Sequence, residues 1–364
     1  MIPYLLVFLT IFSPIVFGEE VSHFIDSTRA LGRGGTSIAA FDSDEAVSFN
    51  SATLAEPSIR FQLRLLQFDG FVSGNTIGTL SDIISLASTG SFVTFLKKLG
   101  TSFSKTQYVK IQVKPLAQRY GAVEVSPFVT NSTHLEMRVR AFPMLSIEND
   151  TVFGSNIAYG RALFKDFNVG LNVRPFYQMT LPSSIDFSTL VDSLSPNASL
   201  TSMFPLYKGF YLGIDPGMLW QLSPSFRWGV TIRDLFDTSA LTGDTTHLPI
   251  YKRQISTGVL QRFDLGHSFN LDLFCDYNDI LNDQEVSLLR RINVGTEVGM
   301  KYLSRDNDLG ITFGANEGYF SFGTFLDLFL FRLDIANYAV EMGEYPGQRR
   351  DRRWSGSIRS TMTF

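Results

Sequence analysis

The last stretch of the chain alternates between two kinds of side chain with a period of two. One series is Trp354, Gly356, Ile358, Ser360, Met362 and Phe364, and the other is Arg353, Ser355, Ser357, Arg359, Thr361 and Thr363. This period predicts a strand with one apolar and one wet face. Such a strand is an aggregation hazard at the edge of a soluble protein. In a closed barrel both of its edges are paired and its apolar face contacts lipid.

The same alternation recurs along the chain. It is clearest where Ile292, Val294, Thr296, Val298, Met300 and Tyr302 alternate with Arg291, Asn293, Gly295, Glu297, Gly299 and Lys301. The segments run for about 10 to 14 residues, the length that a tilted strand needs to cross a bilayer. Strands of soluble sandwiches are shorter, about 5 to 6 residues. We therefore expect an all-β protein, a single transmembrane antiparallel β-barrel.

Counting these segments gives about fourteen strands, an even number as bacterial barrels require. The expected strands are 58–69, one within 106–128, 133–142, 152–164, 168–180, 207–221, 224–235, 252–264, 267–279, 290–303, 307–315, 317–326, 328–342 and 351–364. Pro115 interrupts 106–128, which we assign as one long, kinked strand because a second strand there would break the parity. The last strand is expected to pair with 58–69 and close the barrel.

The predicted connections alternate in length. One set is tight: Asn131–Ser132, Lys165–Asp166, Ser223–Pro224, Leu265–Gly266, 304–306 and Asp327. The other set is mostly long: 71–104, 143–151, 181–206, 236–251, 280–289 and 343–350. Short periplasmic turns and long outer loops are typical of such barrels. Apolar residues at helical spacing predict short helices in the outer loops, over 80–99 and 185–194.

The chain begins with an apolar run, residues 1–18, followed by Glu19 and Glu20. Its length and flanks predict a secretory signal peptide. The alternative, an N-terminal membrane anchor, is disfavoured by the shortness of the run and its two prolines. The balance of 31 basic and 35 acidic residues argues against nucleic acid as a partner. A secreted chain with one cysteine is not a disulfide scaffold.

Residues 19–57 form a small, Gly-rich and acidic segment before the first strand. Its sequence from Ala30 to Ala55 resembles the opening of FadL-type outer-membrane barrels, the superfamily of long-chain fatty-acid and hydrophobic-compound transporters. The matching residues include Gly32, Gly34, Gly35, Asp42, Asp44 and Asn50. Departures are Arg33, Ser51 and Thr53, where the family usually has Met, Pro and Gly.

The resemblance implies that 19–57 is a plug inside a barrel formed by 58–364. It further implies an outer-membrane protein of a Gram-negative bacterium that passes hydrophobic or amphipathic, fatty-acid-like molecules by passive diffusion. The alternative is a scaffold, secretion accessory or surface protein of the same fold. The terminal Phe364 resembles the signal that the barrel-assembly machinery reads during insertion, and outer-membrane lipid surrounds the barrel.

Charged residues of the wet faces are expected to point into the lumen. The ligand candidates among them are Arg60, Arg64, Arg138, Arg140, Arg174, Glu297 and Lys301. Two interpretations stay open: mutual ion pairing that fills the barrel, or arginines that bind the carboxylate of an amphipathic ligand. Pro115 and Pro216 interrupt strands, so each is a candidate for a kink that opens the wall sideways, or for a simple bulge.

The sequence predicts no enzyme, metal site or cofactor. The four histidines are scattered, and none has a partner at a metal-binding spacing. No nucleophile motif of the G-x-S-x-G type is present. The one catalytic alternative would need His134 and Ser155 to meet on neighbouring strands.

Overall fold

The computed structural model describes residues 25–40, 46–55, 61–78, 106–138, 144–186, 205–266, 268–301, 308–328, 330–343 and 346–363. Several predictions concern residues outside these ranges: the signal peptide 1–18, Asp42, Asp44, Arg60, Arg140, the helix over 80–99, and Phe364.

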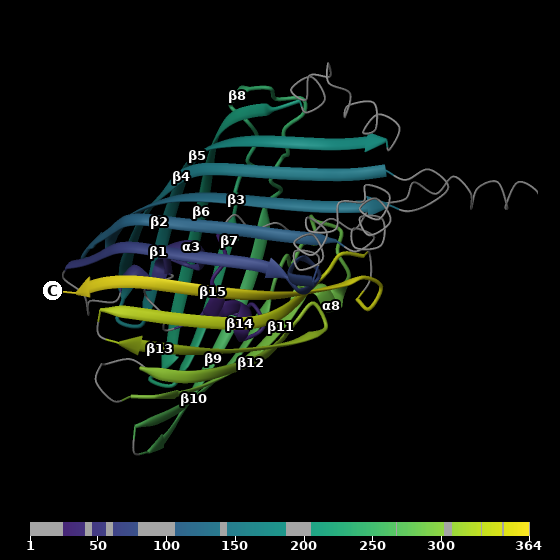
Figure 1. Cartoon of the computed structure of the whole chain (residues 1–364). Coiled ribbons are helices and arrows are strands. Elements are labelled where there is room, and N and C mark those ends of the chain that lie inside the picture. Colours follow the sequence, from purple (N-terminus) through teal and green to yellow (C-terminus); the bar gives the residue numbers. More distant parts are fainter. Residues whose placement is uncertain are drawn as a thin grey trace, which may run out of the picture.

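Strands dominate the described chain (Figure 1). They are β1 (Phe61–Ser73), β2 (Gln107–Tyr120), β3 (Val123–Arg138), β4 (Met144–Phe164), β5 (Phe167–Asp186), β6 (Tyr207–Ser223), β7 (Phe226–Arg233), β8 (Thr242–Gly243), β9 (Gln254–Gly266), β10 (Phe269–Tyr277), β11 (Ile292–Met300), β12 (Leu309–Asn316), β13 (Tyr319–Leu328), β14 (Phe331–Glu341) and β15 (Arg350–Thr363). Short helices are α2 (Thr28–Gly32), α3 (Ala46–Phe49), the 3₁₀-helix η1 (Ser51–Ala55) and α8 (Leu288–Arg291).

Consecutive strands pair antiparallel, and β15 pairs with β1 from Gln62↔Thr363 to Ser73↔Arg353. The result is a closed barrel of 14 strands, because the two-residue β8 only adds to β6 at the rim. This confirms the predicted fold class, the strand count and the pairing of the last strand with the first. We call the end with the tight turns the inner rim and the other end the outer rim. Both ends of the barrel sequence lie at the inner rim.

One part of the predicted strand plan was wrong. Residues 106–128 are not one kinked strand, because β2 ends at Tyr120 and β3 starts at Val123 after a turn at Gly121, which has φ +56°. The predicted turn at Asn131–Ser132 lies in the middle of β3. The predicted loop 143–151 belongs largely to β4, and Ile185 belongs to β5, not to a loop helix. The predicted even number of strands was nevertheless correct, because 123–132 and 133–138 form a single strand, β3.

The misread polar pair has a physical explanation on the barrel surface. The Asn131 amide donates to Thr151 Oγ1 at 2.8 Å, and the Asn149 amide donates to Thr133 Oγ1 at 2.7 Å. These residues satisfy one another across β3 and β4 while the backbone ladder continues beneath them. Polar residues that usually indicate a turn here form a ladder on a strand face.

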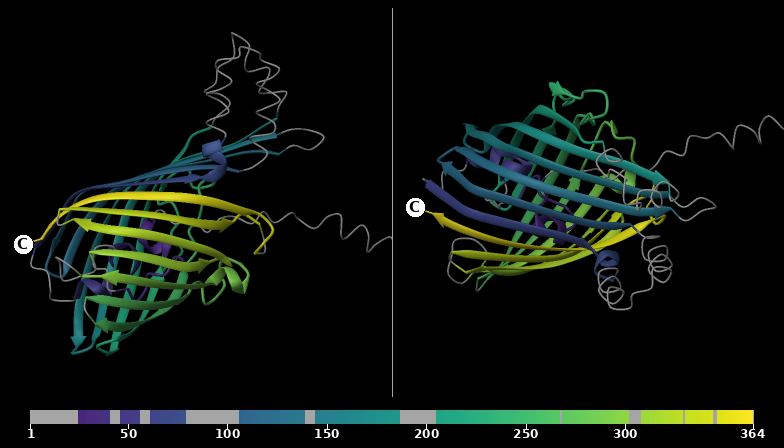
Figure 2. Two further views of the ribbon diagram at one scale, coloured as in Figure 1. Left: turned by 60° about the horizontal axis from the view of Figure 1, so that its bottom comes forward. Right: turned by 45° about the horizontal axis from the view of Figure 1, so that its top comes forward.

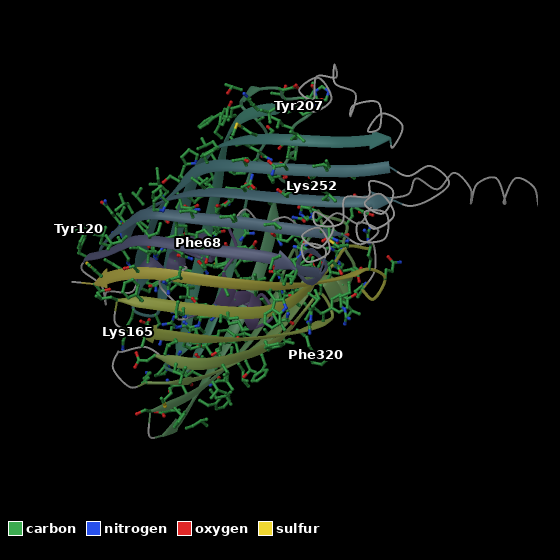
Figure 3. The ribbon with its side chains drawn as sticks, in the orientation of Figure 1. Phe68, Tyr120, Lys165, Tyr207, Lys252 and Phe320 are labelled. Carbon is green, nitrogen blue, oxygen red and sulfur yellow. The ribbon has the colours of Figure 1, made fainter. Side chains whose placement is uncertain are left out.

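Alternation separates the two faces of the wall. In β15 the series containing Arg353, Ser355 and Arg359 is buried, whereas Trp354 and Ile358 are exposed. Aromatic residues are most exposed near the rims, at 78 % for Tyr120 and 82 % for Phe320 (Figure 3). An apolar exterior flanked by aromatic residues is the surface that a transmembrane barrel presents to lipid. No helix in the described ranges is long and apolar enough to cross a membrane.

The N-terminal segment 25–55, where described, lies inside the barrel (Figure 2). Its backbone approaches the wall at inward-facing glycines: Gly160, Gly170, Gly217, Gly229, Gly295, Gly314 and Gly323. A Cβ on Gly170 would lie 2.3 Å from the Ser51 carbonyl carbon, and one on Gly295 would lie 2.0 Å from the Arg33 oxygen. We call these residues the glycine belt. Side chains there would exclude the segment from its place.

We predict that Gly170→Val displaces η1 while the barrel still forms. Overpacking at this contact should cost about 1–3 kcal/mol, and residues 46–55 should become accessible to protease in the folded protein. Gly356→Val is the matched control, because Gly356 is exposed and an added Cβ there meets no atom within 4 Å. Equal protease resistance of the two variants would contradict the prediction.

Candidate functional site

A buried carboxylate on β11 anchors the N-terminal segment. Arg29 Nε donates to Glu297 Oε2 at 2.8 Å, and Arg33 Nη1 lies 3.4 Å from the same oxygen. The two guanidinium groups also stack on Phe325 and Phe274. Burial of charge is costly unless the charge is paired. Glu297 was predicted to face the lumen. Its carboxylate binds the N-terminal segment and does not line an open channel.

Two more side chains fix the segment at other points of the wall. Asp276 of β10 accepts the N–H groups of Ser37 and Ile38 at 2.7 and 3.1 Å. The Asn50 amide donates to the carbonyls of Ile38 and Met218. Asn50 thus joins the two described halves of the segment to β6.

Three glycines of the resemblance motif serve the chain reversal in this segment. Gly34 and Gly35 both have φ +77°, a conformation that other residues rarely adopt. A Cβ on Gly32 would lie 2.5 Å from Thr312 Oγ1. The motif therefore encodes a tight turn pressed against β11–β13, and the boundary of a plug at 19–57 stays a prediction.

We predict that Glu297→Gln releases the first part of the segment. Removing one partner of a buried pair typically costs about 3–5 kcal/mol, since the remaining charge is left uncompensated. Urea unfolding and limited proteolysis after Arg29 and Arg33 measure the effect. Glu285→Gln, at an exposed loop position, is the control and should behave as wild type. Unchanged stability of Glu297→Gln would show that the pair does not hold the segment.

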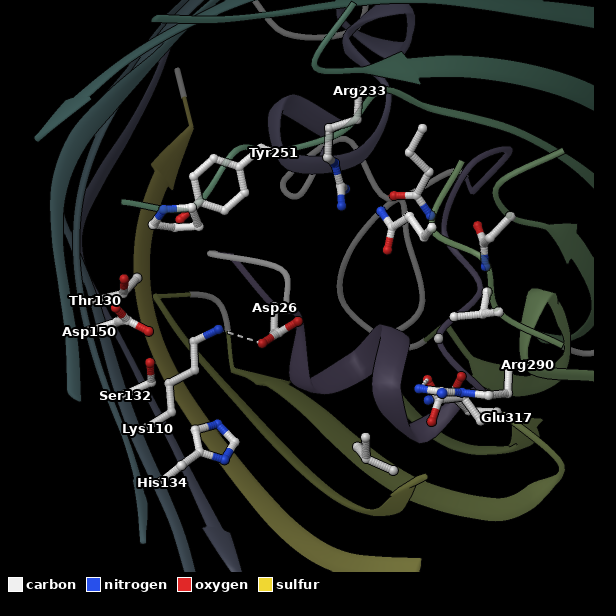
Figure 4. Close-up of a pocket in the computed structure, with 18 of the residues that line it drawn as sticks. Asp26, Lys110, Thr130, Ser132, His134, Asp150, Arg233, Tyr251, Arg290 and Glu317 are labelled. Carbon is white, nitrogen blue, oxygen red and sulfur yellow. Dashed lines mark hydrogen bonds and ion pairs between the residues drawn. The ribbon is translucent and has the colours of Figure 1, made fainter. Parts of the chain in front are cut away.

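A pocket of about 730 Å³ lies between the segment and the outer rim. One of its walls is formed by β2–β5, of which β4 and β5 have 21 and 20 residues, against 8 in β7 and in β12. On this tall wall Lys110, Ser132, Asp150 and Thr180 stand directly opposite one another across four strands. Figure 4 shows the first three along this wall, with the Lys110 ammonium 2.6 Å from Asp26 Oδ2.

The opposite side of the pocket carries further charges. Arg290 of α8 lies 3.6 Å from Glu317, and Arg233, at the end of β7, donates to the Ser48 carbonyl at 3.5 Å. Figure 4 places Arg233, Arg290 and Glu317 across the pocket from Lys110. The pocket therefore has two polar walls that face each other.

An apolar corner adjoins the tall wall. Ile25, Phe128, Val152, Phe176, Tyr211 and Leu248 form one buried cluster, which Tyr251 contacts. The Phe176 and Tyr211 rings stack at 4.7 Å, and Tyr251 meets both edge-on. Leu248 and Tyr251 come from the loop between β7 and β9, so this outer loop folds back into the lumen.

The Tyr251 hydroxyl fixes that loop to the wall by donating to Gln178 Oε1 at 2.6 Å. Burial, followed by the nearby Asp150 charge, raises the pKa of Tyr251 well above its ordinary value. The hydroxyl therefore keeps its proton and remains a donor throughout the physiological range.

Of the other predicted lumen residues, Arg64, Arg174 and Lys301 do not line the pocket. Arg64 lies 3.8 Å from Glu124, and Arg174 lies 3.3 Å from Asp215 and 2.7 Å from Asp234. Lys301 follows β11 at the inner rim, and Arg138 ends β3 at the outer rim. Arg64 and Arg174 thus pair with acidic side chains of the protein, which is the arrangement expected if lumen charges neutralise one another.

The sequence interpretation missed several pocket residues: Asp26, Lys110, Asp150, Arg233, Tyr251 and Arg290. Lys110 was readable, because Val109 and Ile111 alternate with it. Asp150 was hidden by the wrong loop assignment. Tyr251 belongs to a long connection whose inward fold leaves no periodic signal.

Pro115 lies at an interruption of the wall. Between Val113↔Val129 and Gln118↔Val125, four residues of β2 oppose three of β3, and Leu116 has φ +49°. At the same level β1 holds one extra residue, Leu65, against β15, while β1 and β2 stay in register with each other. Leu65 and Leu116 therefore form a paired bulge next to Pro115, and a sideways opening of the wall there stays a prediction.

Pro216 has a milder effect. The β5–β6 ladder runs through Leu171↔Pro216 without a shift, but the β6–β7 ladder stops at Gly217. Beyond it the Asp215 carboxylate accepts the Asp234 N–H at 2.8 Å. The Leu235 N–H also donates to the Ile214 carbonyl at 3.0 Å, so a side chain and a backbone bond connect β6 to the residues after β7.

The structure does not bring together His134 and Ser155, the two residues of the catalytic alternative. His134 pairs with Glu148 and packs on Tyr108 at 4.5 Å between ring centroids, whereas Ser155 pairs with Pro127. The two residues therefore lie at different heights on β3 and β4. Within the described ranges no group of three or more His, Cys, Asp or Glu is placed to hold a metal ion.

Comparisons with known proteins show the fold. No protein-family model and no curated protein matches the sequence. Solved structures match over nearly the whole chain. They include the Pseudomonas putida toluene transporter TodX (TM-score 0.54, 12 % identity, 96 % of this chain and 100 % of that chain) and the Ralstonia pickettii toluene transporter TbuX (0.51, 10 %, 94 % and 99 %).

The CymD monoaromatic hydrocarbon channel is similar to the same degree, with a TM-score of 0.53 and 12 % identity over 93 % of this chain and 97 % of that chain. At these identities the likeness establishes a common barrel fold. It confirms the fold that the resemblance to FadL-type barrels implied.

Proposed function

We propose that this protein is a passive outer-membrane channel of a Gram-negative bacterium for hydrophobic or amphipathic small molecules. The observation that carries the proposal is the 730 Å³ pocket enclosed by the barrel wall, the N-terminal segment and the inward-folded β7–β9 loop. A pocket of this size accommodates a small organic molecule. The apolar exterior supports a membrane location, and the solved hydrocarbon channels of the same fold support the class of compound.

The N-terminal segment directs the route that we propose. Straight passage toward the inner rim is blocked by its contacts with the glycine belt, Glu297 and Asp276. The paired bulge of Leu65 and Leu116 interrupts the wall on the side of β1–β3. We infer that a molecule leaves the lumen sideways at this bulge, passing Phe128 of the apolar corner, which lies opposite the interruption.

The pocket is tested by filling it. Ser132→Trp places an indole over the tall wall, so uptake of radiolabelled toluene by cells that express the protein should fall to the level of cells without it. Thr133→Trp is the matched control, because the neighbouring residue faces the barrel exterior and uptake should stay at the wild-type level. Equal uptake by both variants would contradict a route through the pocket.

The same assay separates the alternative function. If the wild-type protein gives no uptake above background, a scaffold, secretion accessory or surface role is favoured. The outer loops then offer the partner surface, since Phe236, Ile250, Leu281 and Leu289 are exposed there.

The sideways route is tested by removing the paired bulge. Deleting Leu65 and Leu116 together restores equal residue counts from β15 through β3, so the barrel should fold with a continuous ladder and uptake should be lost. Deleting only one shifts β1 against β2 by one residue and turns inward side chains outward, so each single deletion should fail to fold. A folded double deletion with wild-type uptake would exclude this exit.

A further inference from the structure

Asp150 differs from three other carboxylates that line the pocket, because those three are held in ion pairs. Asp26 is paired with Lys110 at 2.6 Å, Glu136 with Arg349 at 2.7 Å, and Glu317 with Arg290 at 3.6 Å. Asp150 has no basic side chain within ion-pair distance among the residues that the structure describes. Its donors are the neutral Thr180 hydroxyl at 2.6 Å and the Gln178 amide at 3.3 Å, and both reach Oδ1.

The second oxygen of Asp150 is available to the pocket. Asp150 is partly exposed and lines the pocket, and no described donor reaches its Oδ2. Its charge is felt nearby, since it contributes to the raised pKa of Tyr251. A partly desolvated carboxylate with a vacant acceptor favours a positively charged hydrogen-bond donor.

The basic groups around the pocket are engaged elsewhere. Lys110, Arg349 and Arg290 are in the ion pairs given above, and Arg233 donates to the Ser48 carbonyl at 3.5 Å. Arg291 donates to the Asp279 carbonyl at 3.1 Å and stacks on Tyr277. A ligand carboxylate would have to displace an existing partner from any of them, whereas an ammonium group displaces nothing at Asp150.

The surroundings of Asp150 also fit the body of such a ligand. Val152 follows two residues later on the same face of β4 and belongs to the apolar corner with Leu248. Tyr251 contacts the same corner and also lines the pocket, and an aromatic ring favours a cation or another aromatic group as its neighbour. A head group at Asp150 therefore directs an apolar body toward Val152, Leu248 and Tyr251.

We propose that the pocket selects amphipathic molecules with an ammonium head group and an aromatic or short aliphatic body, and that Asp150 binds the head group. This inference rests on the proposed channel function and names the ligand class of the same pocket. It differs from a fatty-acid-like ligand, whose carboxylate Asp150 would repel.

Three probes with one body test the proposal: phenethylamine, phenethyl alcohol and phenylpropionate, which are cationic, neutral and anionic at neutral pH. Binding to the purified full-length barrel in neutral detergent is measured by calorimetry. We expect phenethylamine to bind about tenfold more tightly than phenylpropionate, a factor typical of one charge-assisted hydrogen bond. Added salt should narrow this difference.

The variant Asp150→Asn should weaken phenethylamine binding about tenfold and leave phenethyl alcohol nearly unchanged. Asp264→Asn, at an exposed turn of the inner rim, is the matched control and should bind all three probes as wild type does. The change in gel mobility on heating confirms that each barrel is folded. Thr180→Val removes the hydroxyl that donates to Asp150 Oδ1. The carboxylate then keeps more of its negative charge for the ammonium, so phenethylamine binding should tighten, which tests the proposal should Asp150→Asn not fold.

The possible failures are distinct. Equal binding of the three probes, preference for phenylpropionate, or wild-type affinity in Asp150→Asn would overturn the head-group inference while the pocket function stands. Failure of every probe to bind the wild-type barrel, together with absence of toluene uptake, would overturn both.

Discussion

The ladder between β1 and β15 is the contact on which the rest of the molecule depends. Water is absent from the hydrocarbon core, so every backbone N–H and C=O group of the wall needs a partner within the wall. Antiparallel closure of the sheet meets this need, and it requires an even number of strands with both ends of the barrel sequence at one rim. It also restricts defects: the extra residue at Leu65 in β1 is matched by one at Leu116 in β2, so the two strands remain in register.

Closure creates a second problem, which is the filling of the lumen. Because side chains alternate along each strand, the faces opposite to the apolar exterior point inward, and they carry Arg64, Arg174 and Glu297. Buried charges of this kind are stabilised only when they are paired. The chain meets this with internal ion pairs and with its own N-terminal segment. The glycine belt makes room for that segment, and Glu297 and Asp276 supply the acceptors that its arginines and N–H groups require.

How far the sequence predicted this arrangement depended on periodicity. β15 and β11 were readable because each residue reports the face it occupies, and these strands fixed the fold class. β3 was misread because Asn131 and Ser132 are turn formers, whereas the Asn131 side chain is satisfied by Thr151 of the neighbouring β4, a contact that the sequence of a single strand does not reveal. The partners of Glu297 were equally hidden, since Arg29 lies 268 positions away in the sequence. The local sequence pattern predicts which face of a strand a side chain occupies, whereas its bonding partners depend on the register between strands.

The pocket combines features that barrel strands alone do not supply. Strand alternation gives the tall wall its polar row, but the apolar corner needs Ile25 from the N-terminal segment and Leu248 and Tyr251 from the β7–β9 loop. The same inserted parts decide the charge of the pocket. Asp26 of the segment neutralises Lys110, which would otherwise lie two strands from Asp150 as a competing cation. The segment therefore occupies the lumen and also neutralises a cation near Asp150, so the filling of this barrel and the pocket selectivity that we propose depend on the same residue, Asp26.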